Sequence, residues 1–231
     1  MSCHNEIEQN LLKMYSNIEM GTCKDCAECH SKIANLSPPL TAWGVGSSFN
    51  NKKNRILFVG KNARGYEDDE IQTPIEVFDD CRCLWKTKRA WAYWGYTAEI
   101  ARSLFVDDSF ENIAFTNIIK CNNSHNLDTT SILVKTNCIK KLKVLSNEIK
   151  IIRPTHIVFY TARDYDDYIP AVFDSFDVIC NDIKPIGKKK VPWLEAKATI
   201  SNIKVNVLRT GHPERKKKKD FVNAICKWVN E

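Results

Sequence analysis

Four short apolar runs, separated by stretches with helical spacing, constrain the fold of this 231-residue chain more than any other feature. The runs are residues 55–60 (RILFVG), 113–117 (IAFTN), 156–160 (HIVFY) and 205–210 (VNVLRT). Helical spacing of apolar residues occurs at 6–15, 91–105, 139–152 and 221–229. Nearly continuous apolar runs rich in β-branched and aromatic residues are typical of parallel strands buried on both faces. The pattern predicts an α/β fold with a central, mostly parallel four-stranded sheet flanked by helices on both faces.

Length and hydrophobic content predict one domain over residues 1–231, with an N-terminal helical, cysteine-bearing arm at about residues 1–35. The first thirty residues do not resemble a signal peptide, and no apolar run approaches the ~20 residues that cross a bilayer. We therefore expect a cytoplasmic protein that does not contact membranes, and a monomer.

Positive charge is concentrated in two runs, residues 188–190 and 215–219, and the chain carries 34 Lys and Arg against 28 Asp and Glu, a net charge of +6. Such runs can contact phosphates, but they also occur as solvated surface that keeps a protein in solution. Their position relative to a functional site decides between the two interpretations.

Ten cysteines in a chain without secretory features argue against a disulfide framework, because the cytosol keeps thiols reduced. Cys23, Cys26 and Cys29 form a CxxCxxC pattern, while Cys121 and Cys138 lie far downstream. Metal or cluster binding is the natural alternative for such a pattern.

Polar residues follow the predicted strands where each one ends. Gly60-Lys61-Asn62-Ala63-Arg64-Gly65 follows the first, Asn117 ends the second, and Gly211-His212-Pro213 follows the last. Ligands of parallel α/β sheets bind outside the carboxyl ends of the strands, so we expect Gly60, Asn117 and His212 to meet at one edge. The loop GKNARG matches neither the P-loop nor the dinucleotide-binding pattern, which excludes both kinds of nucleotide site.

These segments together resemble the uracil-DNA glycosylase superfamily over roughly residues 23–230. The resemblance rests on Gly-x-Asn after the first strand, Thr-Asn-Ile-Ile-Lys-Cys at the end of the second, and His-Pro after the last. It implies a hydrolase of base-excision repair that flips uracil out of DNA and cleaves its N-glycosidic bond.

The resemblance is closest to the iron–sulfur branch, the family 4 type, in which an N-terminal CxxC pair joins two later cysteines. It implies a [4Fe–4S] cluster held by Cys26, Cys29, Cys121 and Cys138, with zinc as an alternative occupant. Cys23 is an alternative ligand, because the triplet contains two overlapping CxxC pairs. We expect the cluster to hold the N-terminal arm in place and to take no part in redox chemistry.

The resemblance also assigns roles to the strand-end residues. Asn117 would read the uracil edge, because its amide offers both a donor and an acceptor to O4 and N3–H. His212 would donate to O2 as negative charge develops on the leaving base. Asn62 stands where other branches orient the attacking water.

The first motif departs from the iron–sulfur branch, which usually reads Gly-Glu-x-Pro-Gly. Asp68 is a candidate replacement for the catalytic carboxylate, with a helix N-terminal turn as the alternative reading of that acidic segment. Phe78 is the nearest match to the family's stacking ring and Tyr66 the alternative, while Asn126 falls at another family position near the base. The aromatic residues Trp85, Trp91, Trp94 and Tyr96 are interpreted as core.

Arg215, Lys216, Lys217 and Lys218 follow His-Pro where the family places its DNA-entering loop, so we expect them to contact the backbone of single- or double-stranded DNA. The family's apolar wedge is missing here. Two alternatives stay open: a glycosylase for another modified base, and a catalytically silent nucleic-acid-binding module on the same fold.

Overall fold

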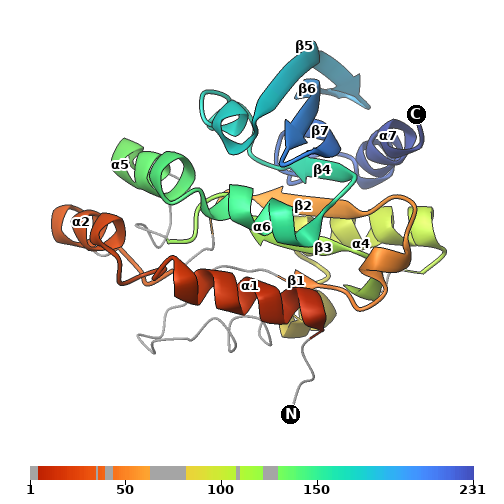
Figure 1. The fold of residues 1–231 in the computed structure, drawn as a ribbon. Coiled ribbons are helices and arrows are strands. Elements are labelled where there is room, and N and C mark those ends of the chain that lie inside the picture. The colour runs from red at the N-terminus through yellow and green to blue at the C-terminus, as the bar shows by residue number, and fades with distance from the viewer. Residues whose placement is uncertain (1–4, 35, 40–43, 63–81, 108–109, 122–129) are drawn as a thin grey trace.

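The strands of this protein form one mixed sheet in the order β1-β3-β2-β4-β7-β6-β5, as seen in a computed structural model that describes residues 5–34, 36–39, 44–62, 82–107, 110–121 and 130–231 (Figure 1). The strands are β1 (Gly44–Val45), β2 (Ile56–Gly60), β3 (Ala114–Asn117), β4 (His156–Phe159), β5 (Ser175–Ile186), β6 (Lys189–Ile200) and β7 (Ile203–Thr210). The pairs β3–β2, β2–β4 and β4–β7 are parallel, whereas β1–β3, β7–β6 and β6–β5 are antiparallel.

The prediction of an α/β fold is confirmed, but the prediction of a four-stranded, mostly parallel sheet is not. The four apolar runs do form the adjacent parallel strands β2, β3, β4 and β7. The sequence pattern predicted no element where β5 and β6 lie. Most of the β5 side chains are exposed, so this strand carries little of the apolar signal that marks a buried strand.

The helices whose bounds the structure describes are α1 (Glu6–Asn17), α2 (Lys24–Lys32), α4 (Ala92–Phe105), α5 (Ile132–Lys135), α6 (Val144–Ile152) and α7 (Lys218–Asn230). Shorter helical turns are η1 (Phe49–Asn51), η2 (Phe110–Asn112), the π-helical η3 (Thr136–Lys141) and η4 (Ile169–Val172). Helix α1 begins with a capping box, in which the Asn5 side chain accepts from the Glu8 amide and the Glu8 carboxylate accepts from the Asn5 amide, both at 3.1 Å.

Two apolar cores lie on opposite faces of the sheet. One packs α1 and α6 against alternate residues such as Leu57 and Ile157. The other packs α4 and α7 against the intervening residues, among them Phe58 and Val158. Helices therefore cover both faces (Figure 1). No helix within the described ranges is long and apolar enough to span a membrane.

The strand order places a candidate ligand site at the carboxyl edge of the sheet. From β2, the chain first adds β3 on one side and then β4 on the other. Such a reversal opens a crevice beyond the strand ends, where ligands of α/β proteins bind. Gly60 and Asn117 end their strands at this edge.

Candidate functional site at the strand ends

Gly60 and Asn117 are in direct register at the ends of β2 and β3. A Cβ atom at position 60 would lie 2.2 Å from Asn117 Oδ1 and 3.3 Å from Tyr93 Cε2, so a side chain there would displace the amide. Asn117 is buried, and its side-chain amide has no hydrogen-bond partner among the residues that the structure describes. The Asn117 amide atoms are not among the polar atoms sealed from solvent, so a water molecule or a ligand can reach them.

Tyr93, on the first turn of α4, lies between Gly60 and His212. Its ring stacks on the His212 imidazole with a centroid distance of 6.2 Å and an interplanar angle of 21°. It meets the Tyr160 ring edge-on at 5.6 Å. The structure therefore places Gly60 and His212 beside the same aromatic ring, with Asn117 next to Gly60.

The loop after β7 sets the tautomer of His212. The Glu214 backbone amide donates to His212 Nδ1 at 3.2 Å, so Nδ1 is an acceptor and the neutral ring carries its proton on Nε2. The His212 side chain is 38% exposed, and the Glu214 carboxylate lies 3.9 Å from Nδ1. His212 is thus preset as an N–H donor at Nε2 without needing a positive charge.

Asn62 and Lys61 make contacts with the segments that precede α5 and follow β4. The Asn62 amide nitrogen donates to Thr130 Oγ1 at 3.4 Å, and the Tyr165 hydroxyl donates to the same oxygen at 3.1 Å. Lys61 forms an ion pair with Asp164, with 2.5 Å between Lys61 Nζ and Asp164 Oδ2. The amide nitrogen of Asn62 is therefore engaged at Thr130.

Lys216 differs from the other predicted backbone contacts. It is half-buried, and its ammonium donates to the His212 carbonyl, while Tyr96 Oη donates to the Lys216 carbonyl at 2.7 Å. Burial lowers the pKa of Lys216. We assign Lys216 to holding the His212 loop, whereas Arg215, Lys217 and Lys218 are exposed.

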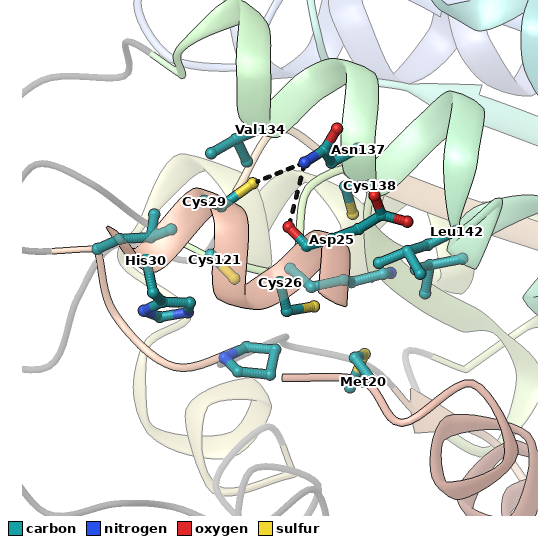
Figure 2. A pocket seen from close by; sticks show the side chains of 14 residues that line it. Met20, Asp25, Cys26, Cys29, His30, Cys121, Val134, Asn137, Cys138 and Leu142 are labelled. Atoms are coloured by element: carbon teal, nitrogen blue, oxygen red, sulfur yellow. Dashed lines mark hydrogen bonds between the residues drawn. The ribbon is translucent and has the colours of Figure 1, made fainter. Parts of the chain in front are cut away.

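Four of the predicted metal ligands line one cavity. Cys26 and Cys29 lie on α2, Cys121 lies after β3, and Cys138 lies in the π-helical turn η3 (Figure 2). The cavity holds about 370 Å³ of space unfilled by atoms, open solvent at its mouth included, and apolar side chains such as Val134 and Leu142 form much of its wall. Cys23 is the residue before α2 and is not among the lining residues.

Hydrogen-bond donors already point at two of the sulfurs. The Gly21 amide donates to Cys26 Sγ at 3.2 Å. Asn137 Nδ2 donates to Cys29 Sγ at 3.3 Å (Figure 2). Donors of this kind stabilise thiolate ligands and tune iron–sulfur clusters.

The surroundings of the four thiols oppose ionisation in the absence of a cation. Burial raises the pKa of Cys26 to about 12 and that of Cys138 to about 11, and it raises the pKa of Cys29 and Cys121 as well. The pKa of Cys121 is raised further by the charges that Cys138, Cys26 and Cys29 would carry. A metal cation would offset these costs, because it binds the deprotonated thiolates.

The chemistry of the four thiols bears on which metal group they could hold. The described residues contain no group of three or more His, Cys, Asp or Glu side chains placed to hold one metal ion. A tetrahedral zinc site needs its sulfurs at ~2.3 Å from one atom. A [4Fe–4S] cluster spreads its four thiolate ligands over four iron atoms. Four thiolates are a donor set that suits either kind of occupant, a cluster or a zinc ion.

A buried ion pair connects this cavity to the strand ends. Lys120, which lines the cavity, lies 2.7 Å from Glu148 Oε1 and donates to the Asn117 carbonyl at 2.6 Å. Both side chains are 1% exposed. Glu148 also accepts from the Tyr15 hydroxyl of α1 and from Thr116 Oγ1. The network fixes the end of β3 between the two regions.

Several sequence predictions are not resolved by this geometry. Asp68, Tyr66, Phe78 and Asn126 lie outside the described residues. Trp85 and Trp94 are buried as predicted, but Trp91 is 56% exposed because it precedes α4 and meets Lys88 instead of the core.

Two residues of this region, Tyr93 and Lys120, were not predicted from the sequence. Tyr93 lies in an aromatic run, WAYWGY, in which core and site residues look alike. Lys120 belongs to the NIIKC segment, in which only the cysteine matches a metal-binding pattern. Nothing in the local sequence indicates that the lysine is buried.

A scan against protein-family models gives no match, and a search of curated proteins gives none either.

Proposed function

We propose that this protein is a DNA glycosylase that removes uracil or a related modified base. The observation that carries the proposal is the placement of two side chains at one sheet edge, Asn117 beside Gly60 and His212 against the Tyr93 ring that approaches Gly60. Asn117 presents an amide that lacks a hydrogen-bond partner among the described residues, and His212 presents an Nε2–H donor. A flipped uracil offers the complementary groups, O4 and N3–H for the amide and O2 for the imidazole.

The proposed chemistry depends on stabilising a leaving anion. Cleavage of the glycosidic bond transfers its electron pair to the base, so negative charge develops on the uracil ring and its O2. The Nε2–H of His212 would strengthen its hydrogen bond to O2 as that charge grows. A neutral imidazole suffices, because the donor is fixed by the Glu214 amide and needs no reorganisation during the reaction.

Water attack would be assisted by orientation only. An amide such as Asn62 has no basic group, so it would position water through Oδ1 while the departing anion lowers the barrier. Nucleotide flipping costs a few kcal/mol of unstacking. Contacts to Asn117 and stacking near Tyr93 would offset that cost.

We further propose that Cys26, Cys29, Cys121 and Cys138 hold a [4Fe–4S] cluster, with zinc as the alternative. The support is their shared cavity and the donors aimed at Cys26 and Cys29. When bound, the cluster would supply structural cross-linking between α2, the end of β3 and η3, in the manner of structural metal sites.

The deciding experiment is release of free uracil from a deoxyuridine oligonucleotide, followed by alkaline cleavage at the abasic site. Single-stranded, U·G and U·A substrates should be tested beside hypoxanthine and xanthine substrates. Release of any of these bases at a rate reduced by His212→Ala supports the proposal. No release from any substrate, by protein shown to contain its metal, would contradict it.

A nucleic-acid-binding module is the second candidate, favoured by the hydrogen bond that engages the Asn62 amide at Thr130. This alternative predicts tight binding of an oligonucleotide that contains uracil or another modified base, without release of that base. Binding that weakens in Asn117→Ala, combined with absent chemistry in the wild type, would select this alternative.

A further inference from the structure

Two lysine runs that are far apart in the sequence lie side by side in the fold. The turn between β5 and β6 carries Gly187, and α7 carries Asp220 in its first turn. A Cβ at Gly187 would lie 2.4 Å from Asp220 Oδ2, and Gly187 has a φ of +58°, so the turn closes tightly on the helix. In Figure 1 the tip of β5 accordingly ends beside α7.

The contact gathers exposed cations onto one surface, which we call the lysine surface. Its members all have exposed side chains: Lys188, Lys189, Lys190, Arg215, Lys217, Lys218 and Lys219. The acids facing them are few. Asp220 pairs with Lys217 at 3.5 Å, Glu214 lies 4.0 Å from Arg215, and Glu99 of α4 lies 3.8 Å from Lys218. The surface therefore retains a net positive charge.

The lysine surface adjoins the loop that carries His212 of the candidate site. Arg215 and Lys217 flank Lys216, whose ammonium holds the His212 carbonyl. A Cβ at Gly211 would lie 3.3 Å from Lys216 Nζ and 3.9 Å from Pro192 Cδ of β6, so the hairpin and the His212 loop are also in contact. A nucleic-acid strand with one base near His212 would thus find cations both on the β5–β6 hairpin and on the loop that follows His212.

The stability of the fold does not explain why these lysines lie here, because their charges are unfavourable for it. Cations at a helix N-terminus oppose the helix dipole, yet α7 starts with Lys217 as its N-cap residue and Lys218 and Lys219 in its first turn. Like charges gathered by two separate segments also repel one another. A polyanion bound across the surface would relieve both effects.

We propose that the β5–β6 turn is a second nucleic-acid-binding element, which grips the sugar–phosphate backbone together with the start of α7. The identity of the partner rests on the proposed function. The contact is with phosphates, so it is independent of sequence and of the presence of a damaged base.

The test uses a fluorescein-labelled 20-nucleotide single strand without uracil and fluorescence anisotropy over a series of KCl concentrations. The variant Lys188→Gln/Lys189→Gln/Lys190→Gln is compared with a matched control, Lys150→Gln/Lys197→Gln/Lys204→Gln. The control lysines are exposed and lie in α6, β6 and β7. Each triple change lowers the net charge from +6 to +3.

The turn variant should bind roughly 10- to 100-fold more weakly at about 0.1 M salt, and its slope of log K against log salt should fall by about 2, since each phosphate contact on a single strand contributes ~0.7. The control should stay within about 2-fold of the wild type. Gly187→Ala keeps every charge but strains the turn against Asp220, and it should weaken binding several-fold.

Equal losses in the turn variant and the control would overturn the inference, because they would reflect net charge alone. An unchanged turn variant would overturn it as well. Uracil release by the wild type is scored separately. Selective loss of binding without any base release would leave this inference standing and reject the glycosylase, whereas base release without selective loss would do the reverse.

Discussion

The cysteine cavity and the candidate site at the strand ends lie on either side of Lys120, yet they are built in different ways. The candidate site, formed by Gly60, Tyr93, Asn117 and His212, is called the pocket below. In the cavity, protein donors are directed at sulfur: Gly21 at Cys26 and Asn137 at Cys29. In the pocket, the Asn117 amide has no such partner among the described residues, and Gly60 leaves it room. The sulfurs of the cavity thus already accept protein hydrogen bonds, whereas the Asn117 amide keeps its donor and acceptor for another group. This difference agrees with our proposals of a permanent occupant in the cavity and a transient one at the strand ends.

Lys120 makes the two regions depend on each other. It lines the cavity, pairs with Glu148, and donates to the carbonyl of Asn117. A change in the packing around the cysteines would therefore reach Asn117 through one side chain. The following predictions separate the two regions or test their connection.

The largest effect is expected from removing a cavity sulfur. Cys29→Ser should abolish bound iron and sulfide, together with absorbance near ~400 nm, because each thiolate of a cluster is needed. Structural metals contribute on the order of 10 kcal/mol to folding, so the variant should also melt far below the wild type. Cys23→Ser is the matched control, and it should retain the metal.

Metal analysis of the wild type sharpens this test. Zinc without iron would keep the four-cysteine site and remove the iron–sulfur assignment. Loss of metal from Cys23→Ser with retention in Cys29→Ser would reverse the assignment of ligands.

The next effect is expected at the link between the regions. Lys120→Met leaves the Glu148 carboxylate buried without its cation, which should lower the free energy of unfolding by about 3–5 kcal/mol. Lys120→Met/Glu148→Leu should recover much of that loss, because no buried charge remains. Urea unfolding measures both. A double variant no more stable than the single one would show that the ion pair is not the cause.

In the pocket, His212→Ala should reduce the rate of base release about 10²- to 10³-fold, as does the loss of one donor to a developing anion. Its thermal stability should change little, because His212 is partly exposed. Glu214→Gln is the control. It preserves the backbone amide that sets the His212 tautomer, so single-turnover rates should stay within a few-fold of the wild type. A large loss in this control would mean that the carboxylate itself matters.

The smallest effect concerns His156, which lies in neither region and serves as a reference for the fold. Burial lowers its pKa from 6.5 to about 4, so its stabilisation is complete above pH 6.5 and is lost as the pH falls towards 4. The expected loss is about 2–3 kcal/mol. His156→Gln should flatten this part of the pH profile of urea unfolding. Identical profiles for both proteins would refute the assignment.

Local sequence pattern was sufficient for the parallel part of the sheet. The apolar runs at β2, β3, β4 and β7 and the helical spacing at α1, α4 and α7 predicted those elements. It also predicted that Gly60, Asn117 and His212 would approach one another, because the carboxyl ends of parallel strands share an edge.

Tertiary structure alone decided the rest. β5 and β6 extend the sheet beyond the predicted four strands, and β5 is too exposed to show apolar periodicity. The positions of Tyr93 beside His212, Lys120 between cavity and pocket, and Lys188 near the start of α7 depend on which distant segments pack together. Periodicity and composition indicate which side chains of a segment are buried and which are exposed to solvent. A site depends on contacts between distant segments, and the sequence of one segment does not indicate which other segment it will contact.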